Sequence, residues 1–519
     1  MRLKFLLFIA VLFVICTGFY QGTVEVQTKY GIVQGEKDAQ LNLDIFKGIP
    51  FAQPPVGNLR WKAPQTPASW KGVRETKSFA PAAVQTNVFG DMVYRGDGFS
   101  EDCLYLNIWT PETQPNKKLP VLVYFYGGGF VAGDGSEPRY DGASLAQQGI
   151  VVITVNYRLN IFGFFAHPQL SAESDYAASG NYGLLDQNAA LRWVAENISG
   201  FGGDPSKITI AGESAGSISV SAQMASPLSR ELLSGAIGES GGMIKPTLPP
   251  VPLSEAEKIG EEVVEKSGYT FEEFRKLPTD SIFKIYNTSG RFGFPVVIDN
   301  HFLPKSLPEI FKEGEQAQIP LLVGWNSAEM SPEAFLQGND FSLENFRNKV
   351  GEAYPEDRER VLDLYPVQTE AKVKEAATNL ASDRFISYST WKWAELHSTN
   401  SENPVYRYLF SRIRPADPAS EYKPSGAAHA SEIEYFLGNL SKEYFPFLKE
   451  KDFKISNTIQ QYLVNFIKTG NPNSEGLEYW PSLKEKQTNS VMVMDEKFQV
   501  IKPDNENRYR FHDQYYGND

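Results

Sequence analysis

The chain has 519 residues, of which 41% are hydrophobic and 13% aromatic, a composition that supports a large apolar core. Acidic residues outnumber basic ones by 63 to 50, and the formal net charge is -13. Because no basic run or stripe of lysine and arginine interrupts this acidic balance, the composition argues against nucleic acid as a partner.

Residues 1–22 differ in composition from the rest of the chain. A cationic start with Arg2 and Lys4 precedes an apolar run over residues 5–15, and small residues follow it. This run is too short to cross a bilayer as a helix, so we predict a signal peptide and a secreted or periplasmic protein. After its removal no stable membrane insertion is expected. A retained membrane anchor is the alternative.

Removal of this segment leaves a single cysteine, Cys103. One thiol cannot form an internal disulfide, so the fold must depend on core packing even in an oxidising compartment. Residues 103–109 alternate in the manner of a strand, and we therefore expect Cys103 to be buried rather than to act as a nucleophile.

The first elements after the signal peptide differ in regularity. Alternating apolar residues over residues 23–35 predict a β-hairpin. Residues 46–61 are rich in proline and glycine yet strongly apolar, and we expect them to pack as an ordered irregular loop.

Short apolar runs typical of strands covered on both faces recur along the chain. They lie at residues 104–109, 121–126, 150–155, 208–211, 236–238, 321–324 and 405–410. Helical patterns separate them, and the one over residues 182–198 has a continuous apolar face. This order predicts an α/β fold with a large, mostly parallel central sheet flanked by helices.

Two inserts, at about residues 245–318 and 330–404, are more polar and more helical than the rest. Helical patterns occur at residues 253–267, 343–350 and 369–393, and a further amphipathic helix is expected at 457–470. We expect the inserts to form a cap over the carboxyl edge of the sheet, where substrate would enter. Residues 23–519 are accordingly predicted to form one domain that carries both inserts.

Residues 207–216 (KITIAGESAG) contain a β-branched strand that runs into a G-x-S-x-G pattern. Such a pattern is typical of a nucleophile elbow, in which the serine occupies a strained turn from strand to helix. Gly212 and Gly216 would be required there because a Cβ would collide with neighbouring backbone. Ser214 is the candidate nucleophile. For the pattern alone, a loop serine between two turn glycines is the alternative.

An elbow serine requires a base to accept its proton. Of the five histidines, His429 lies in a run of small residues (SGAAHASE) after the strand predicted at 405–410, as expected of a loop that presents an imidazole at a sheet edge. His397 and His512 lie among charged neighbours, and we expect both to be exposed.

The base in turn requires a carboxylate that orients it. In α/β hydrolases the order along the chain is serine, acid, histidine, and the acid follows a later strand. Glu329 meets this condition because it follows the strand predicted at 321–324. A helix N-terminal glutamate is the alternative interpretation.

Three glycines, residues 127–129, follow the strand predicted at 121–126, and Phe130 comes next. Their freedom lets the backbone turn N–H groups into the space beside the serine, where they could bind an oxyanion. The Ala215 N–H, at the start of the elbow helix, is expected to be a further donor. A flexible turn is the alternative for the glycines alone.

Taken together, these stretches resemble the type B carboxylesterases of the α/β-hydrolase fold, a family that includes cholinesterases, para-nitrobenzyl esterases and the inactive neuroligins. The matching stretches lie at residues 46–55, 59–61, 100–107, 126–130, 156–159, 180–187, 201–205, 212–216, 240–241 and 429–434. The resemblance implies a serine esterase with Ser214 as nucleophile, His429 as base and Glu329 as acid. It also implies oxyanion donors at Gly128, Gly129 and Ala215, a small-molecule ester as substrate, and no metal or cofactor.

The chain departs from the family pattern in three places. The acid loop reads Ala328-Glu329-Met330, where the family usually has Asp-Glu-Gly. The family's cysteine partner of Cys103 would fall near Ala83 and is missing, so we expect the loop at 79–85 to be unpinned. Residues 91–99 lack the tryptophan that binds choline in cholinesterases, which argues against choline esters.

A catalytically silent, neuroligin-like binding ectodomain is the alternative function from another class. Those proteins lose the serine, whereas this chain keeps Ser214, Glu329 and His429. The sequence therefore favours an enzyme.

Overall fold

The computed structural model describes residues 22–114, 116–338, 340–419, 424–485 and 489–517. The predicted signal peptide, residues 1–22, lies outside this part of the chain except for Gly22. Among the described residues, no helix is both long and apolar enough to cross a membrane.

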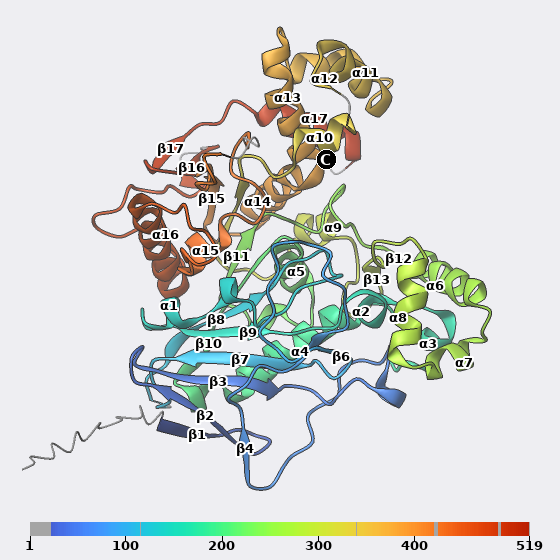
Figure 1. Cartoon of the computed structure of the whole chain (residues 1–519), viewed down its shortest axis with the longest axis vertical. Coiled ribbons are helices and arrows are strands. Elements are labelled where there is room, and N and C mark those ends of the chain that lie inside the picture. Colours follow the sequence, from blue (N-terminus) through green and yellow to red (C-terminus); the bar gives the residue numbers. More distant parts are fainter. Residues whose placement is uncertain (1–21, 115, 339, 420–423, 486–488, 518–519) are drawn as a thin grey trace, which may run out of the picture.

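A mixed sheet of 13 strands forms the centre of the molecule (Figure 1). In spatial order its strands are β1 (Gly22–Gln27), β2 (Ile32–Asp38), β3 (Leu43–Pro50), β7 (Tyr105–Thr110), β9 (Val151–Val155), β8 (Leu119–Phe125), β10 (Gly203–Glu213), β11 (Gly235–Glu239), β14 (Leu321–Asn326), β15 (Val405–Phe410), β16 (Val491–Met494) and β17 (Gln499–Ile501), with β4 (Val73–Glu75) beside β2. All neighbours from β9 to β16 are parallel. The structure confirms the predicted parallel core and the hairpin of β1 and β2. It also contains all seven predicted buried strands, of which β7 runs antiparallel to β9.

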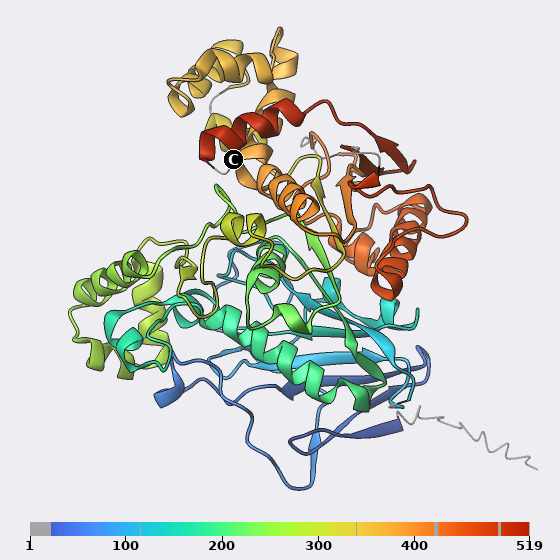
Figure 2. The same ribbon diagram turned by 180° about the vertical axis from the view of Figure 1, so that it is seen from behind.

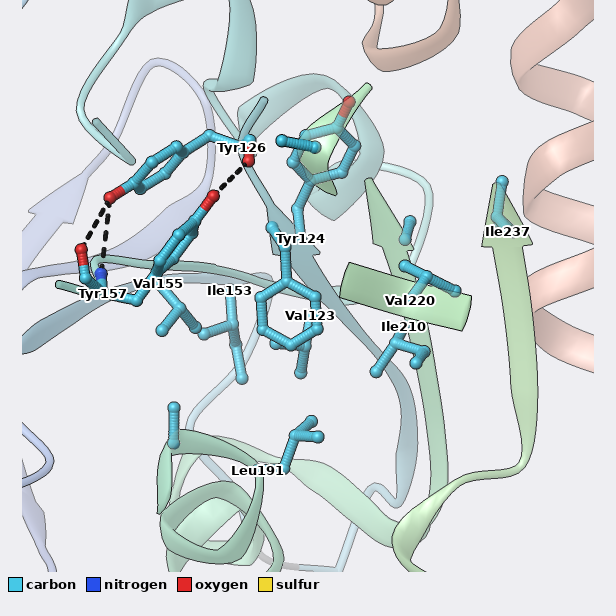
Figure 3. Packing of buried hydrophobic residues seen from close by; sticks show 14 of the residues in the cluster. Val123, Tyr124, Tyr126, Ile153, Val155, Tyr157, Leu191, Ile210, Val220 and Ile237 are labelled. Carbon is cyan, nitrogen blue, oxygen red and sulfur yellow. Dashed lines mark hydrogen bonds between the residues drawn. The ribbon is translucent and has the colours of Figure 1, made fainter. Parts of the chain in front are cut away.

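Both faces of the sheet are covered, which explains why its central strands are continuous apolar runs. On β8, the Val123 side chain points toward Leu191 of α4 (Tyr182–Asn197), whereas Tyr124 points to the opposite face (Figure 3). There the Tyr124 ring packs against Tyr140 at 5.2 Å between centroids. Figure 2, the view from behind, shows α4 lying across the face of the sheet that is turned toward the viewer.

The remaining helices outside the inserts connect the strands or close the C-terminal part. They are α1 (Ala143–Ala146), α2 (Asn160–Phe164), α3 (Pro168–Glu173), α5 (Ala215–Ala225), α15 (Ile433–Leu437), α16 (Glu450–Thr469) and α17 (Glu506–Tyr516). Helix α16 begins before the predicted residue 457 because the Asp452 carboxylate accepts a hydrogen bond from the Lys449 N–H (2.8 Å) and caps an earlier first turn.

The expectation of an irregular loop over residues 46–61 is wrong for its first part. Residues up to Pro50 belong to β3, which pairs with both β2 and β7. The register of the pairing with β7 shifts between Phe46 and Ile49. Gly48 lies in this irregularity with a φ of 73°, which glycine adopts without strain, so β3 continues past it. Pro50 ends the strand, where a missing N–H costs little.

The loop at 79–85 is held in place without a disulfide, so the expectation of an unpinned loop is also wrong. Its residues Ala82–Ala83 (β5) pair with Phe99–Ser100 (β6). The Gln85 amide then donates to the Gly133 carbonyl (2.9 Å) and accepts from the Gly133 N–H (2.7 Å). Cys103 is buried and free, as predicted.

The first insert contains α6 (Leu253–Ser267), α7 (Phe271–Lys276), α8 (Thr279–Thr288) and α9 (Leu307–Lys312), together with the short pair β12 (Val251–Pro252) and β13 (Val297–Ile298). The second contains α10 (Pro332–Leu336), α11 (Leu343–Ala353), α12 (Arg358–Leu364), α13 (Glu370–Ser382) and α14 (Tyr388–Asn400). In Figure 1 the first lies to the right of the sheet and the second above it, beside α17. The helix predicted over residues 369–393 is interrupted by a π-helical turn, Asp383–Ser387.

Candidate active site

Ser214 lies in a sharp turn between β10 and α5. Its backbone angles, φ 54° and ψ -119°, are strained for a residue other than glycine. The Ser214 N–H donates to the carbonyl of Glu239 at the end of the neighbouring strand β11 (2.8 Å), which stabilises the turn. The side chain is thereby presented at the carboxyl end of the central strands.

Two glycines make this turn possible. A Cβ on Gly216 would lie 2.0 Å from the carbonyl oxygen of Phe125, and one on Gly212 would lie 2.5 Å from the carbonyl carbon of Gly216. Any side chain at either position would therefore separate α5 from the sheet. The G-x-S-x-G pattern thus has a steric cause in this fold.

His429 bridges Ser214 and Glu329. Its Nε2 atom lies 2.9 Å from the Ser214 Oγ, and its Nδ1 atom lies 2.6 Å from the Glu329 Oε2. The loops that carry the acid and the histidine are joined because the Ala328 N–H donates to the carbonyl of Ala427 (2.9 Å). Although Ala328 and Met330 depart from the family pattern, the loop that carries Glu329 thus keeps its contact with the loop that carries His429.

Glu329 is buried and its second oxygen is also bound. Its Oε1 accepts hydrogen bonds from the Ser240 hydroxyl (2.5 Å) and the Asn326 N–H (2.6 Å). Helix α10 begins only at Pro332 and has Ser331 at its N-cap, so the alternative of a helix N-terminal glutamate does not apply. Both oxygens of the carboxylate therefore accept hydrogen bonds, and these bonds fix its orientation toward His429.

Further buried carboxylates surround the imidazole. Glu213 Oε1 lies 3.2 Å from His429 Nε2, and the hydrogen bond of Nε2 is made to Ser214 instead. Burial raises the pKa of Glu213 to about 7 and that of Glu432 to about 8. Burial lowers the pKa of His429, but the carboxylates of Glu213 and Glu329 outweigh burial and raise it above its ordinary value.

The glycine loop presents free backbone donors. Gly128 and Gly129 have φ angles of 112° and 63°, and a Cβ on Gly128 would lie 2.2 Å from the carbonyl oxygen of Ala132. Within the described residues, the N–H groups of Gly128, Gly129 and Ala215 donate no hydrogen bond. All three residues line the same cavity as Ser214, so these donors are available to an oxygen of a bound molecule.

This cavity has a volume of about 620 Å³ and a largely apolar wall. Its apolar lining includes Phe89 and Met92 from the loop before β6, Ile218 from α5, Leu248 and Phe292 from the first insert, and Met330, Phe385 and Ile386 from the second. The cavity suits an organic molecule whose apolar arms extend to both sides of the Ser214 hydroxyl.

The structure corrects the expectation that His397 and His512 are exposed. Both are fully buried: His397 Nε2 lies 2.8 Å from the carbonyl oxygen of Ile319, and His512 Nε2 lies 2.9 Å from the Tyr365 hydroxyl. Burial lowers their pKa values to about 4 and about 3. Charged neighbours in sequence misled the prediction because adjacent helical residues face different sides.

Residues without an assigned role in the sequence also belong to the site, namely Glu213, Ser240, Asn326 and Glu432. The G-E-S-A-G motif contains Glu213, but only the fold brings its carboxylate to His429. In the described part of the chain, no group of three or more histidine, cysteine or acidic side chains is arranged to hold a metal ion.

The mixed sheet, the elbow and the hydrogen-bonded serine, histidine and glutamate define the class of the protein as an α/β hydrolase. The chain belongs to the Carboxylesterase family, whose model matches residues 22–512. Its fold class and its relationship to the type B esterases are thereby confirmed, and it is a carboxylic ester hydrolase that acts on small-molecule esters. This favours the enzyme over the catalytically silent binding module.

Similar proteins and structures include several esterases. The chain is 35% identical over 482 residues to the fumonisin B1 esterase of Sphingopyxis macrogoltabida, with 88% of this chain and 84% of that protein covered. It is 33% identical over 508 residues to the para-nitrobenzyl esterase of Bacillus subtilis (strain 168), with 93% and 98% covered. A solved PNB esterase matches with a TM-score of 0.79 and 32% identity over 93% of this chain and 98% of that one. A carboxylesterase of Geobacillus stearothermophilus matches with a TM-score of 0.79 and 31% identity over 94% and 99%.

Proposed function

We propose that the protein is a serine carboxylesterase that forms an acyl-enzyme on Ser214, with His429 as general base and Glu329 as the orienting acid. The observation that carries this proposal is the continuous chain of hydrogen bonds from the Ser214 Oγ through both ring nitrogens of His429 to the Glu329 carboxylate. In this arrangement the Nδ1–H of His429 donates to Glu329, which leaves Nε2 free to accept the serine proton.

In the first half-reaction the Ser214 Oγ attacks the ester carbonyl carbon while its proton passes to His429 Nε2. The carbonyl oxygen becomes an oxyanion, for which the N–H groups of Gly128, Gly129 and Ala215 are the proposed donors. When this intermediate collapses, the bond from carbon to the alcohol oxygen breaks, and the imidazolium gives its proton to the leaving alcohol.

In the second half-reaction a water molecule attacks the acyl-enzyme. His429 takes a proton from the water, the oxyanion forms again, and its collapse releases the carboxylic acid while the proton returns to the Ser214 Oγ. Glu329 accepts the hydrogen bond of the His429 Nδ1–H and stabilises the imidazolium. Ser240 and Asn326 act as positioning residues because they bind the Glu329 oxygen that faces away from His429.

We also propose that the two inserts form one domain with the sheet and act as its cap. Support comes from the cavity around Ser214, whose wall includes Leu248 and Phe292 from the first insert and Phe385 from the second. The inserts would then determine which acyl and alcohol groups fit.

Labelling with a fluorophosphonate probe tests the proposed nucleophile. We expect one probe to be incorporated per folded chain, and peptide mass spectrometry to locate it on Ser214. Folded protein that remains unlabelled, or that is labelled at another residue, would contradict the proposal.

The pH dependence of kcat/KM provides a separate test of His429. The base must be neutral, and nearby carboxylates raise its pKa, so activity should be lost on acidification with a midpoint above the ordinary histidine value. Replacing Glu213 by glutamine removes one of these carboxylates and should lower the pKa of His429. The acidic limb should then move to lower pH by about one unit.

The exposed Glu231 provides a matched control, since Glu231→Gln makes the same chemical change away from the site. We expect its pH profile to coincide with that of the unmodified enzyme. A flat profile between pH 5 and pH 9 (about the range in which histidine titrates) would exclude His429 as the base.

We further propose that residues 1–22 direct secretion and are then removed. The proposal rests on their cationic start and short apolar run. Sequencing the N-terminus of protein recovered outside the cytoplasm should show a new terminus near Thr23, and recovery of the intact segment would contradict cleavage.

A further inference from the structure

Arg384 lies in the wall of the cavity that contains Ser214 and His429. It belongs to the π-helical turn Asp383–Ser387 between α13 and α14. The next residue, Phe385, also lines the cavity, and its ring meets the His429 ring edge-on with 5.2 Å between centroids. π-Helical turns are rare in proteins, and those that occur are frequently found at functional sites. One turn therefore contributes both an apolar contact to the proposed base and a cation to the cavity.

The Arg384 guanidinium is oriented by aromatic rings rather than by an acid. It lies 5.7 Å from the centre of the Phe335 ring and 5.3 Å from that of Tyr354. Among the residues that the structure describes, Arg384 forms no ion pair and donates no hydrogen bond. The adjacent Asp383 is instead bound to Arg508 at 2.9 Å. Stacking on rings leaves the five N–H donors of the guanidinium available.

The other arginine of the cavity differs in this respect. Arg139 forms ion pairs with Asp91 (2.8 Å) and Glu137 (3.0 Å), so its charge is already neutralised. A neighbouring cavity of about 380 Å³ shares Arg384 and Phe385 with the first, and its lysine, Lys349, is paired with Glu352 at 2.7 Å. Among the arginine and lysine residues described in the lining of both cavities, Arg384 is thus the one whose N–H groups are not bound to an acid.

We propose that Arg384 binds a carboxylate of the substrate, so that the preferred substrates are esters with an anionic group on one of their two arms. The guanidinium can bind a carboxylate through two parallel hydrogen bonds, and the apolar wall strengthens such a pair by excluding water. Because the chain as a whole carries a charge of -13, this attraction must be local and not a property of the net charge. The inference rests on the proposed esterase function of the same cavity.

Two series of matched esters test the proposal and distinguish the two arms. In the acyl series, para-nitrophenyl half-esters of dicarboxylic acids from adipic to sebacic acid are compared with para-nitrophenyl esters of monocarboxylic acids of equal length. In the alcohol series, the butyrate of para-(hydroxymethyl)benzoic acid is compared with that of para-methylbenzyl alcohol. We expect kcat/KM to favour the anionic member by about 10-fold or more in at least one series.

Replacing Arg384 by glutamine should remove this preference, and Arg384→Lys should retain part of it because lysine keeps the charge but not the planar pair of donors. Arg347→Gln is the matched control. Arg347 is an exposed residue of α11 in the same insert and lines neither cavity. We expect its preference for anionic esters to equal that of the unmodified enzyme. An equal loss in both glutamine variants would show long-range steering and overturn a site at Arg384.

A binding measurement separates this inference from the esterase mechanism. In protein with Ser214 replaced by alanine, titration calorimetry should show tighter binding of the preferred anionic ester than of its neutral partner. The added Arg384→Gln change should abolish that difference. If neutral esters are hydrolysed but neither series shows an anionic preference, the carboxylate site is wrong and the esterase stands. If no ester is hydrolysed and calorimetry still shows binding that depends on Arg384, the esterase proposal fails and the site stands.

Discussion

Replacing Ser214 by alanine is expected to lower kcat by a factor of about 10⁶, which leaves only the rate that oxyanion donors and substrate binding can support. The methyl side chain cannot form the bond to the acyl carbon, and His429 loses the hydroxyl that lies 2.9 Å from its Nε2. The rate of para-nitrophenyl butyrate hydrolysis, corrected for spontaneous hydrolysis, provides the measurement.

Ser206→Ala is a suitable control because Ser206 is exposed on the same strand, β10, at a distance from the elbow. It should have nearly the kcat of the unmodified enzyme. Both variants should unfold at temperatures close to that of the unmodified protein. A Ser214→Ala enzyme that folds and retains a tenth or more of kcat would exclude the acyl-enzyme mechanism.

Replacing Glu329 by glutamine is expected to lower kcat by about 10⁴ with little change in KM. The amide oxygen should occupy the position of Oε1, where the Ser240 hydroxyl and the Asn326 N–H both donate. The amide NH₂ is then forced toward His429 Nδ1, which must accept a hydrogen bond. The proton of the neutral imidazole moves to Nε2, and this tautomer cannot accept the proton of Ser214.

The exposed Glu333, in the first turn of α10, provides the corresponding control. Glu333→Gln makes the same chemical change close in sequence and should leave kcat nearly unchanged. The result that would contradict the role of Glu329 is a fall in kcat of less than tenfold in the folded variant. An equal fall in both variants would instead indicate a nonspecific effect on the loop.

Much of the fold could be predicted because its central strands carry a simple signal. Parallel strands buried on both faces must be mainly apolar, and β8, β9 and β14 are, with Thr154 and Asn326 as exceptions. The prediction was less reliable at the sheet margin, where β3 passes Gly48 through a register shift. Local composition indicates a loop there, and only pairing with two neighbouring strands makes the segment regular.

The candidate site divides in a similar way. Ser214, Glu329 and His429 could be selected from the sequence because each follows a predicted strand and their order matches that of a known fold. His397 and His512 were misjudged, since the sequence around a helical residue does not show which side of the helix faces the core.

The sequence by itself therefore determined the strands, the elbow and the order of the residues proposed for catalysis, because these depend on local patterns along the chain. Only the tertiary structure decided which distant groups surround His429, among them Ser240, which binds the far oxygen of Glu329. It also decided that Arg384, between two helices of an insert, lines the cavity of Ser214 without an acidic partner among the described residues. Such contacts join residues far apart in the chain, and their geometry results from packing that no local pattern records.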